Sequence, residues 1–372
     1  MGDKQLGFLP TPSNETVKQI ADELRSQPAL CIFDNLHQKK WRSWTSVSHE
    51  DLARWMVWRA TQASPAQAID DVWRYVRAET FPLTHVVVIG GVRVREPVTL
   101  AEGVEPMPFA CLPESLAKAH FADLCLPPHG HHRSLAALLL RQTATKVHLP
   151  EPVLNDQERE EEIRIAQRFE DAILCLTIAE PCGPYEIGSY TATEEWVPGG
   201  GIGMGHATVI GPAFSFEEAQ LSDEGIERLK GLFAAFLGLA SEEKARIRLP
   251  MQRLNLSLRR TGLEEQAIDL GIALETALLL DRGAAQGGIT TTLRIRGARL
   301  LGHSFEERQK IQRTIRDVYE LRSKAVHGGS VPPEHRGEAT NRILHEGSRI
   351  AAAAIEKQIL GGRPDWDRVL LE

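Results

Sequence analysis

One long helix near the C-terminus constrains the fold of this chain more than any other stretch. Residues 304–307, Ser-Phe-Glu-Glu, have the Ser-x-x-Glu pattern of a capping box, in which each end bonds the other's backbone amide. The segment from Tyr319 to Gly329 closes on two glycines, which readily take the left-handed conformation that ends helices. The pattern therefore predicts a helix over residues 304–326 that stops at the glycine pair.

The apolar face of this helix contains a charge. At about 100° per residue, six apolar side chains span an arc of roughly 140° that we expect to be buried. These side chains are Ile311, Ile315, Val318, Leu321, Ala325 and Val326. Arg322 falls inside the same arc, and a guanidinium that leaves water must be paired or bound to something. His327 follows five residues later and diverges from Arg322 by about 140° on an ideal helix, unless the helix loosens there or a second subunit completes the site.

A second predicted helix, over residues 263–282, carries a matching carboxylate. Glu275 lies within about 60° of Ile272 and Leu279 on the helical wheel, so it too sits in an apolar stripe. Glu275 and Arg322 would relieve each other's desolvation if the two helices pack together. The pair could be a structural ion pair that holds a bundle together, or it could orient Arg322 at the floor of a cleft.

The segment Arg322–His327, Arg-Ser-Lys-Ala-Val-His, matches the R-x4-6-H signature of HEPN ribonucleases. With its flanking residues it reads Tyr-x-x-Arg-Ser-Lys-x-Val-His-Gly and resembles the ApeA-like branch of that family, which is associated with bacterial anti-phage defence. Upstream stretches at 272–279, 293–302 and 306–308 fall in the order expected of that branch. The resemblance covers roughly the last 130 to 160 residues.

The resemblance implies a metal-independent RNA endonuclease with no cofactor. In that reaction the ribose 2′-hydroxyl attacks the adjacent phosphorus and leaves a cyclic phosphate and a free 5′-hydroxyl. Arg322 would stabilise the charge that builds on the phosphoryl oxygens, because a fixed guanidinium binds them bidentately. His327 would move protons, since its ordinary pKa near 6.5 suits acid–base work at neutral pH. The resemblance leaves open whether His327 is the base or the acid.

Supporting roles follow from the same resemblance. Ser323 occupies the place of a polar residue that helps orient the site, and Tyr319 and Lys324 are candidate phosphate contacts. Glu275 would hold Arg322 in place. The family works as a homodimer with the two motifs facing each other, which predicts that two copies of this chain share one RNA substrate.

Other functions stay open at this point. The helical part could be a catalytically silent HEPN module for dimerisation or for binding RNA or a partner. A metal-dependent hydrolase could centre on His129, His131 and His132, although an exposed loop explains those histidines better because no cysteine or carboxylate lies at ligand spacing. As a defence or toxin effector, the chain would carry a site for a phage-derived trigger in its N-terminal part.

Length and composition predict two domains of the α+β class. The chain has 372 residues, is 42% hydrophobic and carries a net charge of −7. We expect a mixed α/β sensing or regulatory domain over 1–213 and an all-α, HEPN-like helical bundle over 214–372. The mild acidity argues against indiscriminate nucleic-acid binding, whereas arginines dense between Lys244 and Lys324 could form either a solvated helix face or a phosphate-facing surface.

Local patterns place the elements of the N-terminal part. Capping signals predict helices after Ser13, Ser48 and Ser64. Apolar runs predict strands at 29–33, 174–178, 185–197 and 207–210, and a hairpin over 85–95 that turns at Gly90-Gly91. Residues 156–171 form an acidic helical run, and residues 199–206 form a glycine-rich loop that fails both phosphate-binding patterns. The tryptophans between 41 and 73 predict a core, with a base-stacking platform as the alternative.

The helices of the C-terminal part are expected at 222–239, 241–260 with an interruption at Pro250, 263–282, 290–301, 304–326 and 338–360. The five cysteines form no Cys-x-x-Cys pair, and we interpret them as buried thiols in a reducing compartment. The N-terminal residues lack an apolar signal region, and no run approaches about eighteen apolar residues, so we expect no membrane contact and a cytoplasmic location.

Overall fold

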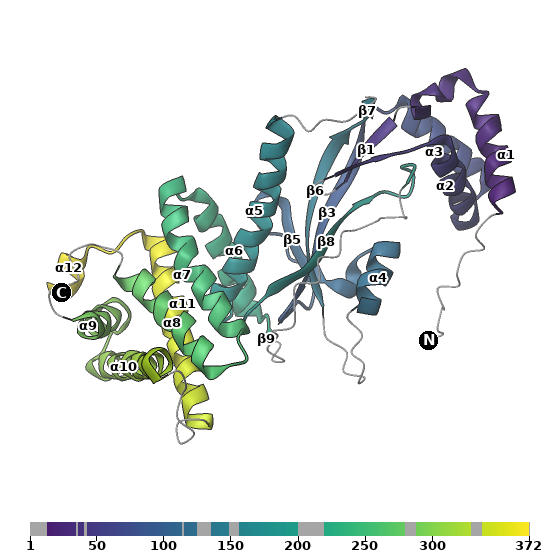
Figure 1. The fold of residues 1–372 in the computed structure, drawn as a ribbon. Coiled ribbons are helices and arrows are strands. Elements are labelled where there is room, and N and C mark those ends of the chain that lie inside the picture. The colour runs from purple at the N-terminus through teal and green to yellow at the C-terminus, as the bar shows by residue number, and fades with distance from the viewer. Residues whose placement is uncertain are drawn as a thin grey trace.

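The computed structural model of the chain describes residues 13–34, 36–40, 43–113, 115–124, 135–148, 156–199, 219–279, 288–328 and 337–371. Its fold is α+β, as expected from the sequence. Figure 1 shows the C-terminal helices at one end, a sheet in the middle, and three helices from the N-terminal part at the other end. The predicted domain boundary at residue 213 lies outside the described residues.

A four-stranded antiparallel sheet forms the centre of the molecule, with strand order β5-β6-β3-β8. The strands are β3 (Thr80–Gly90), β5 (Val104–Pro108), β6 (Ala136–Thr145) and β8 (Tyr185–Thr193). Successive side chains of a strand point to opposite faces. Val87, Ile89 and Leu138 face one apolar cluster, and Val86 and Val88 face another that includes Phe121 of α4 (Leu116–Leu124). Both faces of the sheet are therefore covered.

The N-terminal elements form a separate apolar cluster beside the sheet. They are α1 (Asn14–Arg25), the 3-10 helix η1 (Pro28–Asp34), β1 (Leu36–Lys40), β2 (Ser43–Ser46), α2 (His49–Gln62) and α3 (Pro65–Arg77). Strand β1 pairs with β2 and with β7 (Val147–His148). Trp55 is fully buried in this cluster, and Trp58 and Trp73 pack against it. The prediction of an aromatic core is confirmed at these positions.

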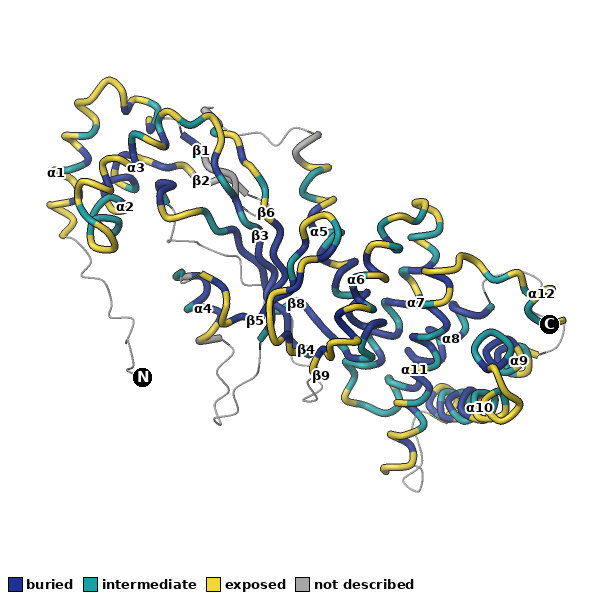
Figure 2. The backbone as a smooth tube through the Cα atoms, turned by 180° about the vertical axis from the view of Figure 1, so that it is seen from behind, coloured by how far each residue is buried: buried dark blue, intermediate teal, exposed yellow. Residues whose placement is uncertain are grey.

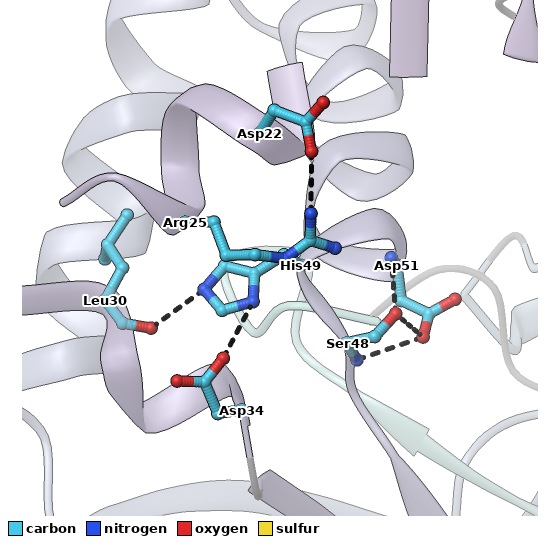
Figure 3. Close-up of polar contacts among 7 residues, drawn as sticks. All are labelled: Asp22, Arg25, Leu30, Asp34, Ser48, His49 and Asp51. Atoms are coloured by element: carbon cyan, nitrogen blue, oxygen red, sulfur yellow. Dashed lines mark hydrogen bonds and ion pairs between the residues drawn. The ribbon is translucent and has the colours of Figure 1, made fainter. Parts of the chain in front are cut away.

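Helix α2 begins as its sequence predicts. Its first residue, His49, contacts two residues of η1. The Ser48 side chain accepts from the Asp51 amide at 3.2 Å, and the Asp51 carboxylate accepts from the Ser48 amide at 3.0 Å (Figure 3). His49 is buried, and its Nε2 donates to the Leu30 carbonyl at 3.2 Å while its Nδ1 lies 3.4 Å from Asp34. The strand predicted at 29–33 is wrong, because Leu30 and Phe33 turn inward at helical spacing.

Helix α5 (Asp156–Ala179) connects the sheet to the C-terminal helices. The acidic half was predicted correctly as a helix, but the strand predicted at 174–178 is wrong, because the helix continues through it. Leu174, Leu176 and Ile178 are all buried, which removes the one-sided pattern that marks most helices. A short apolar run of this kind does not distinguish a buried strand from a buried helix.

The hairpin predicted over 85–95 is also wrong. Strand β3 pairs with β6 and β8, while the short β4 (Val92–Arg93) pairs in parallel with β9 (Ala219–Gln220). Gly91 does adopt a positive φ of 80°, so the chain turns where expected. Val92 and Val94 are buried while Arg93 and Arg95 are exposed, which confirms the predicted alternation.

Strand β8 confirms most of the strand predicted at 185–197. The strand predicted at 207–210 and the loop after Gly199 lie outside the described residues, as do His129, His131 and His132. Of the five cysteines, Cys175 and Cys182 are buried, as expected, whereas Cys31 and Cys111 are exposed, which corrects the prediction of uniformly buried thiols.

The C-terminal part is a set of packed helices. These are α6 (Asp223–Gly238), α7 (Ser241–Arg259), α8 (Leu263–Leu278), α9 (Ile289–Leu301), α10 (Phe305–Gly328), α11 (Glu338–Gly361) and α12 (Trp366–Leu371). The first six confirm the predicted helices, but the interruption expected at Pro250 is wrong, because α7 continues through that residue. Figure 2 shows that buried positions line the inner faces of these helices and that exposed positions alternate with them on α10. In the part of the chain that the structure describes, no helix has the length and apolarity needed to cross a membrane.

Candidate active site

Helix α10 positions the residues that the sequence singled out. It begins at the predicted capping box, where the Glu307 carboxylate accepts from the Ser304 amide at 3.2 Å and the Ser304 hydroxyl accepts from the Glu307 amide at 3.1 Å. Its inner face packs against α8, α9 and α11 through Ile315, Val318 and Leu321. Val326 was expected on that face but is 52% exposed, whereas its neighbour Ala325 is buried.

Arg322 lies where the sequence predicts, between the inner face of α10 and helix α8. Its Nη2 donates to Glu275 of α8, with the two carboxylate oxygens at 3.2 and 3.3 Å. Its Nη1 donates to the Tyr319 hydroxyl at 3.1 Å, and the guanidinium carbon lies 5.0 Å from the centre of the tyrosine ring. The ion pair predicted from the two helical wheels is therefore present.

Tyr319 completes a triangle with Arg322 and Glu275. Its hydroxyl donates to the Glu275 carboxylate at 2.8 Å. Burial raises the pKa of Tyr319, and the hydrogen bond to Glu275 raises that pKa further. Tyr319, a candidate phosphate contact, connects the other two side chains in this structure through its hydroxyl. We call these three residues the Arg322 cluster.

The Arg322 cluster is only partly withdrawn from solvent. The side chains of Arg322 and Glu275 each remain 24% exposed. Arg322 Nε is buried and has no hydrogen-bond partner among the described residues. Glu275 and Tyr319 thus hold the guanidinium in a fixed orientation while part of the Arg322 side chain stays exposed to solvent.

Glu275 lies near the end of α8, and hydrogen bonds from two neighbouring helices hold that end in place. Arg296 of α9 is buried and donates to the carbonyl of Leu278 at 2.9 Å, and Gln358 of α11 donates to the carbonyl of Ala277 at 2.7 Å. Carbonyls in the last turn of a helix have no partner within the helix, so these two bonds satisfy them. Neither role was predicted from the sequence, although Arg296 belongs to one of the stretches that carry the family resemblance.

His327 and its neighbours lie at the exposed end of α10. Ser323 and His327 are exposed, and Lys324 is half-buried. The helix does not loosen at His327, because it continues through Gly328. On a continuous helix Arg322 and His327 diverge by about 140°, so one chain does not bring them together.

Several other sequence signals contribute no site. Many of the arginines between Lys244 and Lys324 are engaged in ion pairs, such as Arg248 with Asp171 and Arg316 with Asp317. Among the residues that the structure describes, no group of three or more His, Cys, Asp or Glu side chains is arranged to hold a metal ion.

Comparisons of the chain with protein-family models, with curated proteins and with solved structures return no match.

Proposed function

We propose that this chain is an endoribonuclease of the HEPN type and that its C-terminal helices carry the site. The observation that supports this most is the Arg322 guanidinium, which Glu275 and Tyr319 fix in place while 24% of the side chain stays exposed. A guanidinium held in this way is preorganised to bind a phosphate oxygen as charge develops on it. The R-x4-6-H motif and the upstream stretches that resemble the ApeA-like branch support the same proposal.

The reaction is a transesterification that needs no metal ion. The ribose 2′-hydroxyl loses its proton and attacks phosphorus, the bond to the 5′-oxygen breaks, and that oxygen takes up a proton. Arg322 stabilises the negative charge on the phosphoryl oxygens during the attack. His327 transfers one of the two protons. Its exposed position at the end of α10 makes it accessible to the sugar–phosphate backbone of an RNA. The products are a cyclic phosphate and a free 5′-hydroxyl.

The working unit in this proposal is a homodimer. Arg322 and His327 diverge on a continuous helix, so a pair that acts on one phosphate comes from two copies of α10. The exposed Val326 lies between them in sequence and offers apolar area for such a contact. A two-fold axis would bring both copies of the motif to one groove, because an isologous contact uses the same patch on both subunits.

The resemblance also suggests a biological setting. An effector of anti-phage defence or a toxin would be restrained until a trigger arrives, and residues 1–213 would sense a phage-derived partner. This step rests on analogy with the family, since fold and site chemistry do not identify a trigger.

The test is cleavage of a labelled single-stranded RNA by the purified protein in excess chelator. We expect a cyclic phosphate on the upstream product, and a loss of about hundredfold or more in rate for Arg322→Ala and for His327→Ala. Arg313→Ala and His345→Ala are matched controls, because both residues are exposed on α10 and α11 outside the Arg322 cluster. Cleavage that survives in both site variants, or that stops with chelator, would overturn the proposal.

A catalytically silent helical module is the second candidate, and one observation favours it. Both terminal nitrogens of Arg322 already bond protein groups, as they would in a purely structural ion pair. The same assay separates the two, because a silent module would bind the labelled RNA or a second copy without cleaving. In that case Arg322→Ala would lower the free energy of unfolding but leave RNA intact.

A further inference from the structure

A large cavity lies away from the Arg322 cluster, at the junction of the sheet and the C-terminal helices. It has a volume of about 860 Å³, and α5, α7 and the beginning of β8 form its walls. Pockets for small organic ligands have volumes of about 300 to 1,000 Å³ and often occur where two layers of a protein meet. The apolar part of the wall comes from Val87, Phe169, Leu174, Tyr185 and Leu256.

The guanidinium of Arg259 lies in this wall, partly buried and without a carboxylate partner in the described part of the chain. Among the described residues, Arg259 forms no ion pair, and its buried Nε has no hydrogen-bond partner. Its guanidinium carbon lies 5.3 Å from the centre of the Tyr185 ring. Burial lowers the pKa of Arg259, as expected for a cation withdrawn from water without an anion beside it.

The other arginines of α7 show what is missing. Each of them has a carboxylate partner at 2.7 to 3.0 Å. The pairs are Arg246 with Glu243, Arg248 with Asp171, and Arg253 with Asp269. Arg259 belongs to the same helix and lines the cavity, but no carboxylate of the described chain is placed to pair with it. An anion from outside the chain would supply that partner.

Two glycines make room for the arginine and the ring. A Cβ atom on Gly183 would lie 2.7 Å from Arg259 Cγ, and one on Gly90 would lie 2.6 Å from the Tyr185 hydroxyl. Real side chains do not approach that closely, so both positions need glycine for Arg259 and Tyr185 to sit as they do. The two glycines therefore provide the space that the unpaired guanidinium of Arg259 and the Tyr185 ring occupy.

We propose that this cavity binds a small organic molecule with one negative charge and an apolar body, and that Arg259 holds the charge. The charge is single because three carboxylates, Glu162, Glu170 and Glu186, line the cavity against two further guanidiniums, Arg159 and Arg253, and this excess of negative charge would repel a polyanion. The apolar body follows from the aromatic and aliphatic wall. A carboxylate on an alkyl chain and a cyclic phosphodiester on a nucleoside share this chemistry.

Calorimetric titration of the full chain tests the proposal with two probes, octanoate and 3′,5′-cyclic AMP. We expect at least one of them to bind, and the arm that binds identifies the source of the charge. Arg259→Met should weaken that binding by about tenfold to a hundredfold, because a hydrogen-bonded ionic contact is lost. Arg164→Met is the matched control, since Arg164 is an exposed residue of α5 that does not line the cavity.

Two further measurements separate a ligand site from a structural role. Ala166→Trp narrows the cavity from α5 and leaves Arg259 unchanged, so it should weaken binding in the folded protein. The melting temperature of Arg259→Met should stay the same or rise, because a partly buried cation without a carboxylate partner is removed. The proposal is overturned if neither probe binds, if Arg259→Met binds as well as the unchanged chain, or if its melting temperature falls.

Discussion

Gly271 of α8 lies directly against the stem of Arg322. A Cβ atom at position 271 would overlap Arg322 Cδ and lie 2.9 Å from Arg322 Nε. The absence of a side chain at Gly271 is therefore what allows the guanidinium to reach Glu275, one turn further along α8. A glycine within a helix costs about 1 kcal/mol relative to alanine, and here that cost coincides with the placement of one arginine.

Gly271→Ala should consequently destabilise the protein, although alanine favours helices. We expect a loss of about 1 to 3 kcal/mol in the free energy of unfolding, because the new methyl group forces Arg322 or α8 to shift. Gly231→Ala is the control, since position 231 lies inside α6 with open space around it and should gain up to about 1 kcal/mol. Urea unfolding of both variants measures the difference. Equal effects at the two glycines would contradict the close packing at Arg322.

The Arg322 cluster should be visible in the titration of Tyr319. Burial and the bond to Glu275 raise its pKa, so the phenol should stay protonated above its ordinary value of about 10. Because the folded-state pKa exceeds the unfolded one, its contribution to stability is full below about pH 10 and is lost as the pH rises through the raised value. The 295 nm absorbance of the unchanged chain minus that of Tyr319→Phe isolates this group.

Replacing Glu275 tests the cause of that shift. Glu275→Gln should lower the pKa of Tyr319, because the anion that opposes ionisation of the phenol is removed, while burial keeps part of the shift. Glu320→Gln removes an exposed charge from α10, the helix that carries Tyr319, and should leave the titration of Tyr319 unchanged. An unchanged pKa in Glu275→Gln would show that the hydrogen bond does not form in solution.

The helix starts were predicted from the sequence, whereas the pairing of the strands was not. Helix starts at Ser48, Ser64 and Ser304 were found because a cap depends on residues within one turn of each other. The hairpin after Gly90 was wrong because β3 pairs instead with β6 and β8, which lie about 50 and 100 residues further on. Pairing between strands so far apart in the chain cannot be recognised from a short stretch of sequence.

The candidate site divides in the same way. The ion pair of Glu275 with Arg322 followed from two helical wheels, because a charge in an apolar stripe needs an opposite charge nearby. The bond from Tyr319 to Glu275 and the space at Gly271 depend on the distance between α8 and α10, which no periodicity reports. The unpaired Arg259 was equally invisible, since it became distinctive only when its neighbours were seen to have partners.

The ion pair of Asp171 with Arg248 should contribute strongly to stability. It connects α5 to α7 through two hydrogen bonds of 2.9 Å, and the Asp171 side chain is only 4% exposed. Asp171→Ala leaves the Arg248 guanidinium without a counter-charge and should lower the free energy of unfolding by about 3 kcal/mol. Glu227→Ala removes a carboxylate that is 73% exposed beside Lys230, and it should cost less than about 1 kcal/mol. Chemical denaturation of both variants provides the comparison.

Mixing two inactive variants tests whether the proposed nuclease site is shared between subunits. Because α10 is continuous through Gly328, Arg322 and His327 of one chain point apart by about 140°. In a heterodimer of Arg322→Ala with His327→Ala, the arginine comes from one chain and the histidine from the other. A shared site would therefore be restored in the heterodimer but in neither homodimer.

The two variants would be mixed, partly unfolded to exchange subunits, refolded, and assayed with the labelled RNA in chelator. Random exchange makes about half of the dimers heterodimers, so a measurable fraction of the original rate should return. Refolding each variant alone is the control and should give no cleavage. Recovery would assign Arg322 and His327 to opposite subunits at one phosphate. If the unmixed chain cleaves but the mixture stays inactive, then both residues must act from the same chain, and α10 would have to unwind near its end when RNA binds.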